Sequence, residues 1–272
     1  MSAADRIARL VFGLYMAAFF LYLFAPLVVM SAATFNTSRF PTVTPWQGTT
    51  LQWFAALWND RPMWQSVWTS LVVAFFVVLV ALPVGTAAAL ILTSLHARAR
   101  SFLYALMVSP LLTPGVVIGI ATLVLWRQLG VGGGLFLIVV AQASFIICYV
   151  MLMVAARLQR FDRTQEEAAL GLGASKFMVF RRVLLPFLRP ALIAAAFLAV
   201  LQSIENYNTT LFVRGFDTPL TVYIATKVRT GLTPAVNALA LIMIAITVLG
   251  AVAYEVARRR RAAAQHAARE PG

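Results

Sequence analysis

The feature that most constrains this chain is a series of long apolar stretches that are almost free of charge. A helix needs about 20 apolar residues to cross the hydrocarbon core of a bilayer. Six stretches reach that length, each bounded by charged or turn-forming residues, and only the fifth holds a charged side chain. They are residues 10–33, 67–95, 101–126, 134–156, 190–213 and 231–254. The pattern predicts an all-α membrane protein with six transmembrane helices in a single transmembrane domain, residues 1–272.

Composition agrees with this prediction. Hydrophobic residues make up 61% of the 272 residues and charged residues 11%, whereas a soluble domain keeps roughly a quarter of its residues charged. Arg6 and Arg9 precede the first stretch, as in a cleavable signal peptide. Its apolar run is longer than the roughly 7–15 residues of a signal core, which favours an uncleaved first helix.

The placement of Lys and Arg predicts the orientation. With the N-terminus inside, 16 of the 22 basic residues fall in cytoplasmic segments, Arg269 among them. The positive-inside rule therefore predicts that both termini are cytoplasmic. All six tryptophans fall in or beside the external segments, so the first external loop, residues 34–65, is predicted to lie at the membrane interface. Packing within that loop explains its tryptophans equally well.

The formal net charge of +13 does not indicate nucleic-acid binding, because the basic residues flank apolar stretches and form no aromatic-interleaved stripe. The single cysteine, Cys148, lies in an apolar run and is read as a packing residue. His96 and His266 lie far apart without a ligand at metal-site spacing. We therefore expect no metal, no cofactor and no catalytic residue.

The longest basic loop, residues 157–189, carries the most specific pattern. Thr164 can cap a short helix whose first turn holds Glu166 and Glu167, where carboxylates suit the positive helix end. An ordinary basic loop that satisfies the positive-inside rule is the alternative on periodicity alone.

A turn and a second helix are expected to follow. Gly171 and Gly173 allow the chain to enter the left-handed region. Residues 174–183 are predicted to form a second short helix, and Pro186 and Pro190 are predicted to end it and start the next span.

Three elements of this loop occur together at a characteristic spacing: Glu167-Ala168-Ala169, then Gly173 followed by Ala174 and Ser175, then Leu185-Pro186. In this the chain resembles the integral membrane subunits of binding-protein-dependent ABC importers, over about residues 60 to 257. The resemblance implies the ABC importer type I permease fold, with six spans and both termini inside, in the bacterial cytoplasmic (inner) membrane.

The same resemblance implies that the loop couples transport to ATP. It would seat in a cleft of a cytoplasmic ATP-binding subunit, with Glu167 paired to a basic group there and Gly173 permitting the turn. The implied partners are a dimer of ATP-binding subunits, a second permease subunit and an extracytoplasmic solute-binding protein. The coupling residues carried over are Glu167, Ala168, Ala169, Gly173, Ala174 and Pro186.

The chain has no ATP-binding loop of its own. A Walker A loop ends in Gly-Lys followed by Ser or Thr, but the two lysines, Lys176 and Lys227, follow Ser175 and Thr226. ATP hydrolysis is therefore expected in the partner subunits.

A polar run in the fifth stretch indicates a translocation path. A carboxylate within a span costs roughly 2.5–3.5 kcal/mol on insertion scales and usually faces a cavity or a partner. Pairing of Glu205 with Arg214 or Lys227 near the outer interface is the alternative. The residues predicted to share one helix face are Gln202, Glu205, Asn206 and Thr209.

Two further segments bear on the path. Pro110 and Pro114, followed by Gly115, are predicted to kink the third stretch. Such kinks occur in transporter pathways and in ordinary packing, so both prolines are path candidates. Residues 220–230 are predicted to form a short external helix that faces the solute-binding partner.

The segment from 203 to 240 resembles the polyamine-type (spermidine and putrescine) branch of the same family. It contains Ser203-Ile204-Glu205-Asn206 and, later, Pro234-Ala235-Val236-Asn237-Ala238-Leu239. The branch resemblance favours a second permease different from this chain. Asn206 replaces a second acid, which weakens the case for a doubly charged cation, and the solute stays open between polyamines and related small polar or cationic compounds.

Two functions from other classes fit the composition less well. An ATP-independent secondary transporter or channel would need more than one buried acid or a visible inverted repeat. A membrane enzyme would need a catalytic constellation within the spans, and the sequence shows none.

Overall fold

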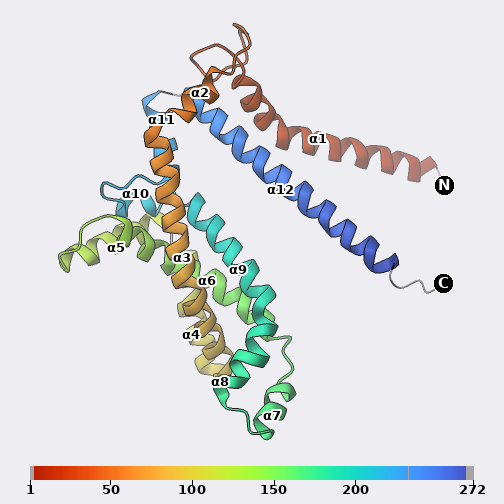
Figure 1. Ribbon diagram of the computed structural model, residues 1–272, viewed down its shortest axis with the longest axis vertical. Helices are drawn as coiled ribbons and strands as arrows, with labels where there is room; N and C mark the ends of the chain where they lie inside the picture. The colour runs from red at the N-terminus through yellow and green to blue at the C-terminus, as the bar shows by residue number, and fades with distance from the viewer. Residues whose placement is uncertain (1–2, 232, 268–272) are drawn as a thin grey trace. The chain divides into compact units, whose positions relative to one another are not determined.

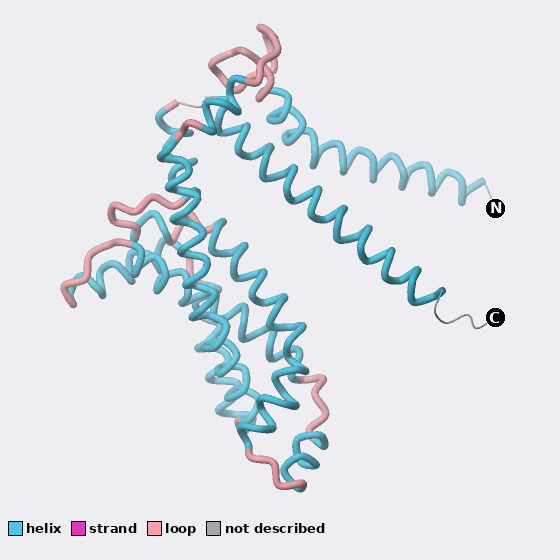
Figure 2. Tube along the Cα trace, in the orientation of Figure 1, coloured by secondary structure: helices cyan, strands magenta, loops and turns pink. Residues whose placement is uncertain are grey.

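The computed structural model of the protein describes residues 3–231 and 233–267 (Figure 1). Arg269, counted above on the cytoplasmic side, lies outside these residues. Figure 2 shows that helices joined by loops make up the described chain. The β pairing within it is one isolated bridge between Asn36 and Thr49, so the all-α prediction is confirmed.

The chain forms two compact units, one of residues 1–61 and 226–272 and the other of residues 62–225. In the first unit, α12 (Pro234–Ala267) contacts both α1 (Ala3–Ala33) and α2 (Gln52–Trp58).

The loop between α1 and α2 is tied together by one buried amide. Asn36 Nδ2 donates to the carbonyl oxygens of Thr42 and Pro45, at 2.9 and 3.1 Å. Trp53 Nε1 donates to the Asn36 carbonyl oxygen at 2.7 Å. Trp53 therefore packs this loop, whereas Trp46 and Trp58 expose 48% and 75% of their surface.

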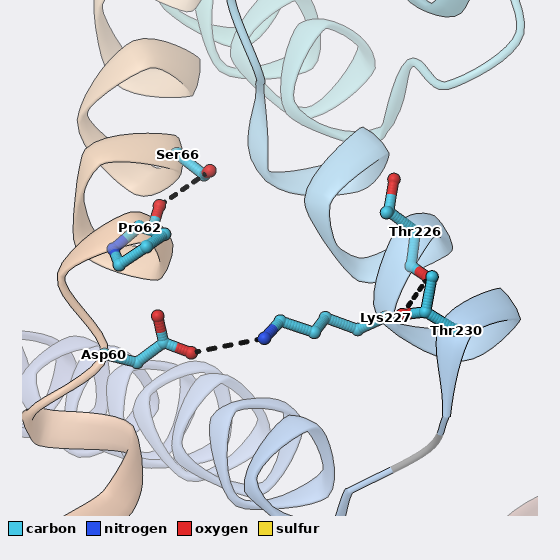
Figure 3. A network of polar contacts seen from close by, with 6 residues as sticks. All are labelled: Asp60, Pro62, Ser66, Thr226, Lys227 and Thr230. Carbon is cyan, nitrogen blue, oxygen red and sulfur yellow. Dashed lines mark hydrogen bonds and ion pairs between the residues drawn. The ribbon is translucent and has the colours of Figure 1, made fainter.

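The short helix expected over residues 220–230 is present as α11 (Leu220–Thr230). Near its end, Lys227 Nζ lies 4.0 Å from Asp60 Oδ2, an ion pair within the first unit (Figure 3). Lys227 thus has an acidic neighbour within its own unit.

The second unit is built around α6 (Leu135–Leu158), which contacts α4 (Ala97–Leu112), α5 (Gly115–Gln128) and α9 (Leu185–Glu205). The long helix α3 (Arg61–Ser94) also belongs to this unit, apart from its first residue. A Cβ added to Gly85 of α3 would lie 2.7 Å from Val150 Cβ of α6, so the glycine lets these two helices approach closely. The fully buried side chains of this core include Val77, Ile138, Ile146, Met151 and Leu188.

Each of the six predicted stretches overlaps a helix. Within residues 3–231 and 233–267, four helices are long and apolar enough to cross a bilayer, and the bent pair α4–α5 makes a fifth candidate. The apolar part of α12 is shorter, Pro234–Gly250. The count of six spans and the cytoplasmic position of the termini stay predictions. The four long helical segments are Asp5–Ala33, Arg61–Ser94, Leu135–Leu158 and Lys176–Glu205.

The prediction that prolines would end the second loop helix is wrong. The helix α8 (Lys176–Val179) continues through a π-helical turn, η1 (Phe180–Leu184), directly into α9. Pro186 lies in the first turn of α9. A π turn changes the hydrogen-bond register, and a proline in the first turn of the α segment that follows needs no amide donor.

Candidate functional site

The kink predicted at Pro110 and Pro114 is a complete break between α4 and α5. The two helices are bent by 101°. Thr113 between them is extended, with φ −87° and ψ 129°, because the ring of the following proline disfavours the helical region. Pro114 is the residue just before α5, with φ −55° and ψ 134°, and Gly115 begins the helix.

The polar run of the fifth stretch is broken as well. Helix α9 ends at Glu205, Asn206 is extended with φ −69° and ψ 105°, and α10 (Thr210–Val213) follows. The predicted single helix face is therefore wrong, since Asn206 and Thr209 lie beyond the end of α9.

The two breaks pack against each other through glycines. A Cβ added to Gly119 would lie 2.6 Å from the carbonyl oxygen of Thr209, and one added to Gly115 would lie 2.9 Å from Thr209 Oγ1. Only a residue without a side chain allows α5 to approach the residue 206–209 segment this closely.

A hollow of about 310 Å³ opens where the breaks meet. It brings together five of the six residues predicted for the translocation path; Pro114 is not among its lining residues. Thr113, Gly115, Tyr149 and Tyr207 also line it and were not predicted. The five predicted residues are Pro110, Gln202, Glu205, Asn206 and Thr209.

A buried hydrogen-bond chain holds the second break in place. Gln142 of α6, 1% exposed, accepts from Ser203 Oγ at 2.6 Å and donates through Nε2 to Thr210 Oγ1 at 2.8 Å. Asn206 Oδ1 in turn accepts from the amide and the hydroxyl of Thr210, at 3.2 and 3.1 Å. Sequence reasoning missed Gln142, although an amide inside an apolar helix is itself a signal.

Glu205 is the acidic side chain that lines the hollow, and it is exposed there. The pairing with Arg214 considered from the sequence is not formed, because the Arg214 guanidinium turns to its own loop. It donates to the Asp217 carbonyl oxygen at 3.2 Å and to Thr218 Oγ1 at 2.9 Å. The carboxylate of Glu205 is therefore available to a ligand.

A larger hollow of about 710 Å³ lies between the first turns of α3 and the segment around Asp217. The carboxylate in the lining of this larger hollow, that of Asp217, already has a structural partner: its Oδ2 accepts a hydrogen bond from the Leu135 amide at 2.7 Å. Because the remaining lining side chains are aromatic or neutral, we place the site in the smaller hollow, where the acid is available.

The second candidate region is the loop between α6 and α9. Helix α7 (Thr164–Gly171) forms where predicted, but Thr164 does not cap it. Asp162 Oδ1 accepts both the Thr164 hydroxyl, at 2.7 Å, and the Thr164 amide, at 3.0 Å. These two hydrogen bonds, the side-chain one first, hold the pKa of Asp162 below its ordinary value.

The turn predicted after α7 is present at Gly173, whose φ is +85°. The Gly173 amide donates to the Leu170 carbonyl oxygen and the Ala174 amide to that of Ala169, at 2.9 and 3.1 Å. This pair of bonds is a Schellman motif, which favours glycine at the left-handed position. Gly171 instead belongs to α7, so the turn uses one of the two predicted glycines.

The tip of the loop is exposed. Leu172 exposes 90% and Phe177 71% of their surfaces, although both are apolar. Glu167 is exposed as well, and over the described part of the chain it forms no ion pair. An exposed carboxylate beside exposed apolar side chains is a surface suited to a protein partner.

The base of the loop is fixed to three long helices. Arg163 at the start of α7 donates to the carbonyl oxygen of Thr93 in α3 at 3.0 Å. Arg157 of α6 donates to the carbonyl oxygen of Phe187 in α9 at 3.3 Å and lies 4.2 Å from the centre of its ring. A force applied to the loop therefore reaches α3, α6 and α9.

The fold is shared with a protein of known structure. The crystal structure of a bacterial ABC transporter involved in the import of the acidic polysaccharide alginate matches with a TM-score of 0.70 and 18% identity, over 95% of this chain and 98% of that one. That similarity shows the ABC importer permease fold.

Two curated relatives are closer in sequence. The spermidine/putrescine transport system permease protein PotC of Escherichia coli K12 is 32% identical over 93% of this chain and 96% of its own length. The putrescine transport system permease protein PotI of the same strain is 33% identical over 88% of each chain. Residues 81–262 match the family described as "Binding-protein-dependent transport system inner membrane component". This chain therefore belongs to the family of inner-membrane permease components of binding-protein-dependent ABC importers.

Proposed function

We propose that this chain forms one half of the path by which an ATP-driven importer carries a small amine, a polyamine or a related polar or cationic solute, across the inner membrane. The observation that carries the proposal is the hollow between the two helix breaks, which presents the free carboxylate of Glu205. The relatives named for spermidine and putrescine transport support the same solute class.

The lining of the hollow suits an ammonium group. Glu205 supplies a negative charge, and the rings of Tyr149 and Tyr207 supply faces that attract cations. Gln202 adds an amide oxygen. A desolvated ammonium needs these partners, because leaving its donors unpaired within a membrane costs several kcal/mol.

The loop 157–189 is proposed to couple this hollow to ATP hydrolysis in two partner ATP-binding subunits. Glu167 would pair with a basic group on such a subunit, and Leu172 and Phe177 would pack against it. The surrounding coupling residues Ala168, Ala169 and Ala174 would complete the contact.

The continuous helix from Lys176 to Glu205 supplies the mechanical connection. At 1.5 Å per residue its 30 residues reach about 45 Å, from the coupling loop to the edge of the hollow. A displacement of α8 would therefore reach Glu205 without an intervening hinge, and Pro186 leaves this connection unbroken. A second, different permease would complete the path, and an extracytoplasmic binding protein would deliver the solute.

The solute path is tested by uptake of labelled putrescine into proteoliposomes that contain the whole transporter. Glu205→Gln should reduce uptake at least tenfold, because it removes the charge that stabilises the ammonium. Glu255→Gln is the matched control, since Glu255 pairs with Arg258 in the C-terminal half of α12, away from the hollow's lining residues, and it should transport normally. Unchanged uptake in Glu205→Gln would reject the hollow as the path.

The coupling role is tested by affinity purification of the tagged chain in mild detergent, with mass spectrometry of the bound proteins. Glu167→Arg should lose the ATP-binding subunit. Gln165→Arg adds the same cation to α7 but keeps Glu167, and it should retain the subunit. Recovery of the chain alone, still able to transport after reconstitution, would support a secondary transporter instead.

A further inference from the structure

The hollow lies between two helix ends of opposite polarity. Its lining includes Glu205, the last residue of α9, and Asn206, which caps that helix. The carbonyl groups at a helix C-terminus carry a partial negative charge equivalent to about half an electron. Together with the Glu205 carboxylate, they make this side of the hollow suited to a cation.

The opposite side begins at the N-terminus of α5, a helix of 14 residues. Gly115, its first residue, lines the hollow. The amides of Val117 and Ile118 donate to the Pro114 carbonyl oxygen, whereas those of Gly115 and Val116 have no acceptor within the described residues. Free amides and the positive end of the helix dipole favour an anion here.

A second observation at the same place concerns a buried hydroxyl. Thr209 is fully buried and lines the hollow, and its Oγ1 has no hydrogen-bond partner among the residues that the structure describes. This oxygen lies 2.9 Å from the position of a Cβ on Gly115, so it faces the start of α5. Buried hydroxyls are rarely left unpaired in native structures, and Thr209 adds a potential donor beside the free amides.

We infer that the solute held in this hollow is a zwitterion, an amine that carries a carboxylate or phosphonate at its other end. This inference rests on the proposed function and sharpens its solute class. The ammonium group lies at Glu205, and the anionic group lies at the start of α5 near Gly115 and Thr209. A diamine would place its second ammonium against the positive end of α5, and the hollow offers that second charge no carboxylate, since Asn206 is neutral.

The experiment measures equilibrium binding of labelled solutes to the purified permease–ATPase complex in detergent, without the extracytoplasmic binding protein. The probes are putrescine and 4-aminobutyrate, which share a four-carbon chain but differ in one terminal charge, and 2-aminoethylphosphonate. The wild-type complex should bind the two zwitterions about tenfold more tightly than putrescine, the ratio expected from opposite charges at one helix end.

Thr113→Asp tests the anionic side directly. Thr113 lines the hollow one residue before Pro114, so an added carboxylate neutralises the positive end of α5. This variant should reverse the preference and favour putrescine. Thr113→Asn introduces an uncharged side chain of nearly the same shape as aspartate, and it should keep the wild-type order of affinities. Glu205→Gln should weaken binding of all three probes.

The outcomes separate this inference from the proposed function. If the wild type binds putrescine more tightly than the two zwitterions, and Glu205→Gln weakens that binding, the solute is not a zwitterion. The proposal that the hollow is a path for an amine would then stand. If Thr113→Asp and Thr113→Asn change the relative affinities for the three probes equally, the start of α5 does not bind an anionic group, and the amine path again stands. Failure of an intact complex to bind any of the three probes would overturn both.

Discussion

The coupling loop and the polar hollow are both irregular segments between helices, but they are held together differently. Within α7 and the turn after it the hydrogen bonds join residues close in sequence, such as Asp162 with Thr164 and Ala174 with Ala169, and Arg163 anchors the loop to Thr93 of α3. Around the hollow they join distant ones, since Gln142 bonds to Ser203 and Thr210, 61 and 68 positions away. Local hydrogen bonds set the helix and the turn of the loop, whereas the hollow exists only when α5, α6 and α9 are packed.

This difference predicts two kinds of damage. A change in the hollow should reduce the stability of the whole second unit, because its polar groups are satisfied only through tertiary contacts. A change in the loop should leave the membrane helices folded and impair only the transmission of force from the ATP-binding subunit.

The largest effect is expected for Gly119→Leu. Any side chain at this position meets the carbonyl oxygen of Thr209, at 2.6 Å from the new Cβ, and a backbone atom in a packed break cannot move aside cheaply. We expect a loss of about 3 kcal/mol, the upper part of the range for overpacked cores, measured as thermal stability in detergent. Gly132→Leu is the control, because nothing lies within 4 Å of its Cβ position. Equal stability of the two variants would contradict the close packing of the breaks.

Gln142→Leu should have the next largest effect. The leucine leaves the hydroxyl of Ser203 without its acceptor and that of Thr210 without a donor, at a cost of about 2 kcal/mol. The thermal unfolding temperature of the purified chain reports this loss. Gln128→Leu, on the exposed side of α5, should change it little. A stable Gln142→Leu variant would show that the second break is held by other contacts.

These two contrasting regions also show what a sequence can predict. Helix α7 and the turn at Gly173 were predictable because the residues that specify them lie within a few positions of one another. One detail was wrong: Asp162, two residues before Thr164, takes the capping role. Either side chain can accept an amide hydrogen bond, so local pattern alone could not distinguish them.

The hollow was only partly predictable. Pro110 and Pro114 indicated the first break, which falls at Thr113 because the ring of Pro114 disfavours a helical conformation of the residue before it. Pro110 itself lies inside α4. The second break contains no proline, and Asn206 leaves the helix where its side chain can bond to Thr210. The contributions of Gln142 and Tyr149 follow from packing between helices, which residue spacing within one helix does not specify.

In the loop, Gly173→Val should uncouple transport with little effect on the fold. A valine at φ +85° is strained by about 1–2 kcal/mol, and the Schellman turn that orients the exposed Leu172 should open. We expect normal yield and thermal stability of the purified chain, but uptake reduced at least fivefold relative to ATP hydrolysis in the reconstituted transporter. Gly171→Ala is the matched control, since Gly171 is helical and nothing lies near its Cβ position. Normal uptake by Gly173→Val would reject the turn as part of the coupling element.

The smallest effect is expected at Asp162, whose carboxylate caps the start of α7 through Thr164. Because the pKa of this carboxyl is lowered in the folded loop, its contribution is present above the ordinary Asp pKa of about 3.9 and is lost as pH falls through the lower folded value. Amide exchange at Thr164 and Gln165, corrected for the intrinsic effect of pH, should therefore lose protection in the wild type as pH falls below about 4. Asp162→Ala should show the reduced protection already at neutral pH, and Asp162→Asn, which keeps an acceptor oxygen but cannot ionise, should show protection independent of pH across this window. Because the cap acts only on α7, exchange in α6 should be the same in all three proteins. A loss of protection in α6 as well would show that the loop and the membrane helices unfold together. The stability of the loop would then depend on the packing of the membrane helices.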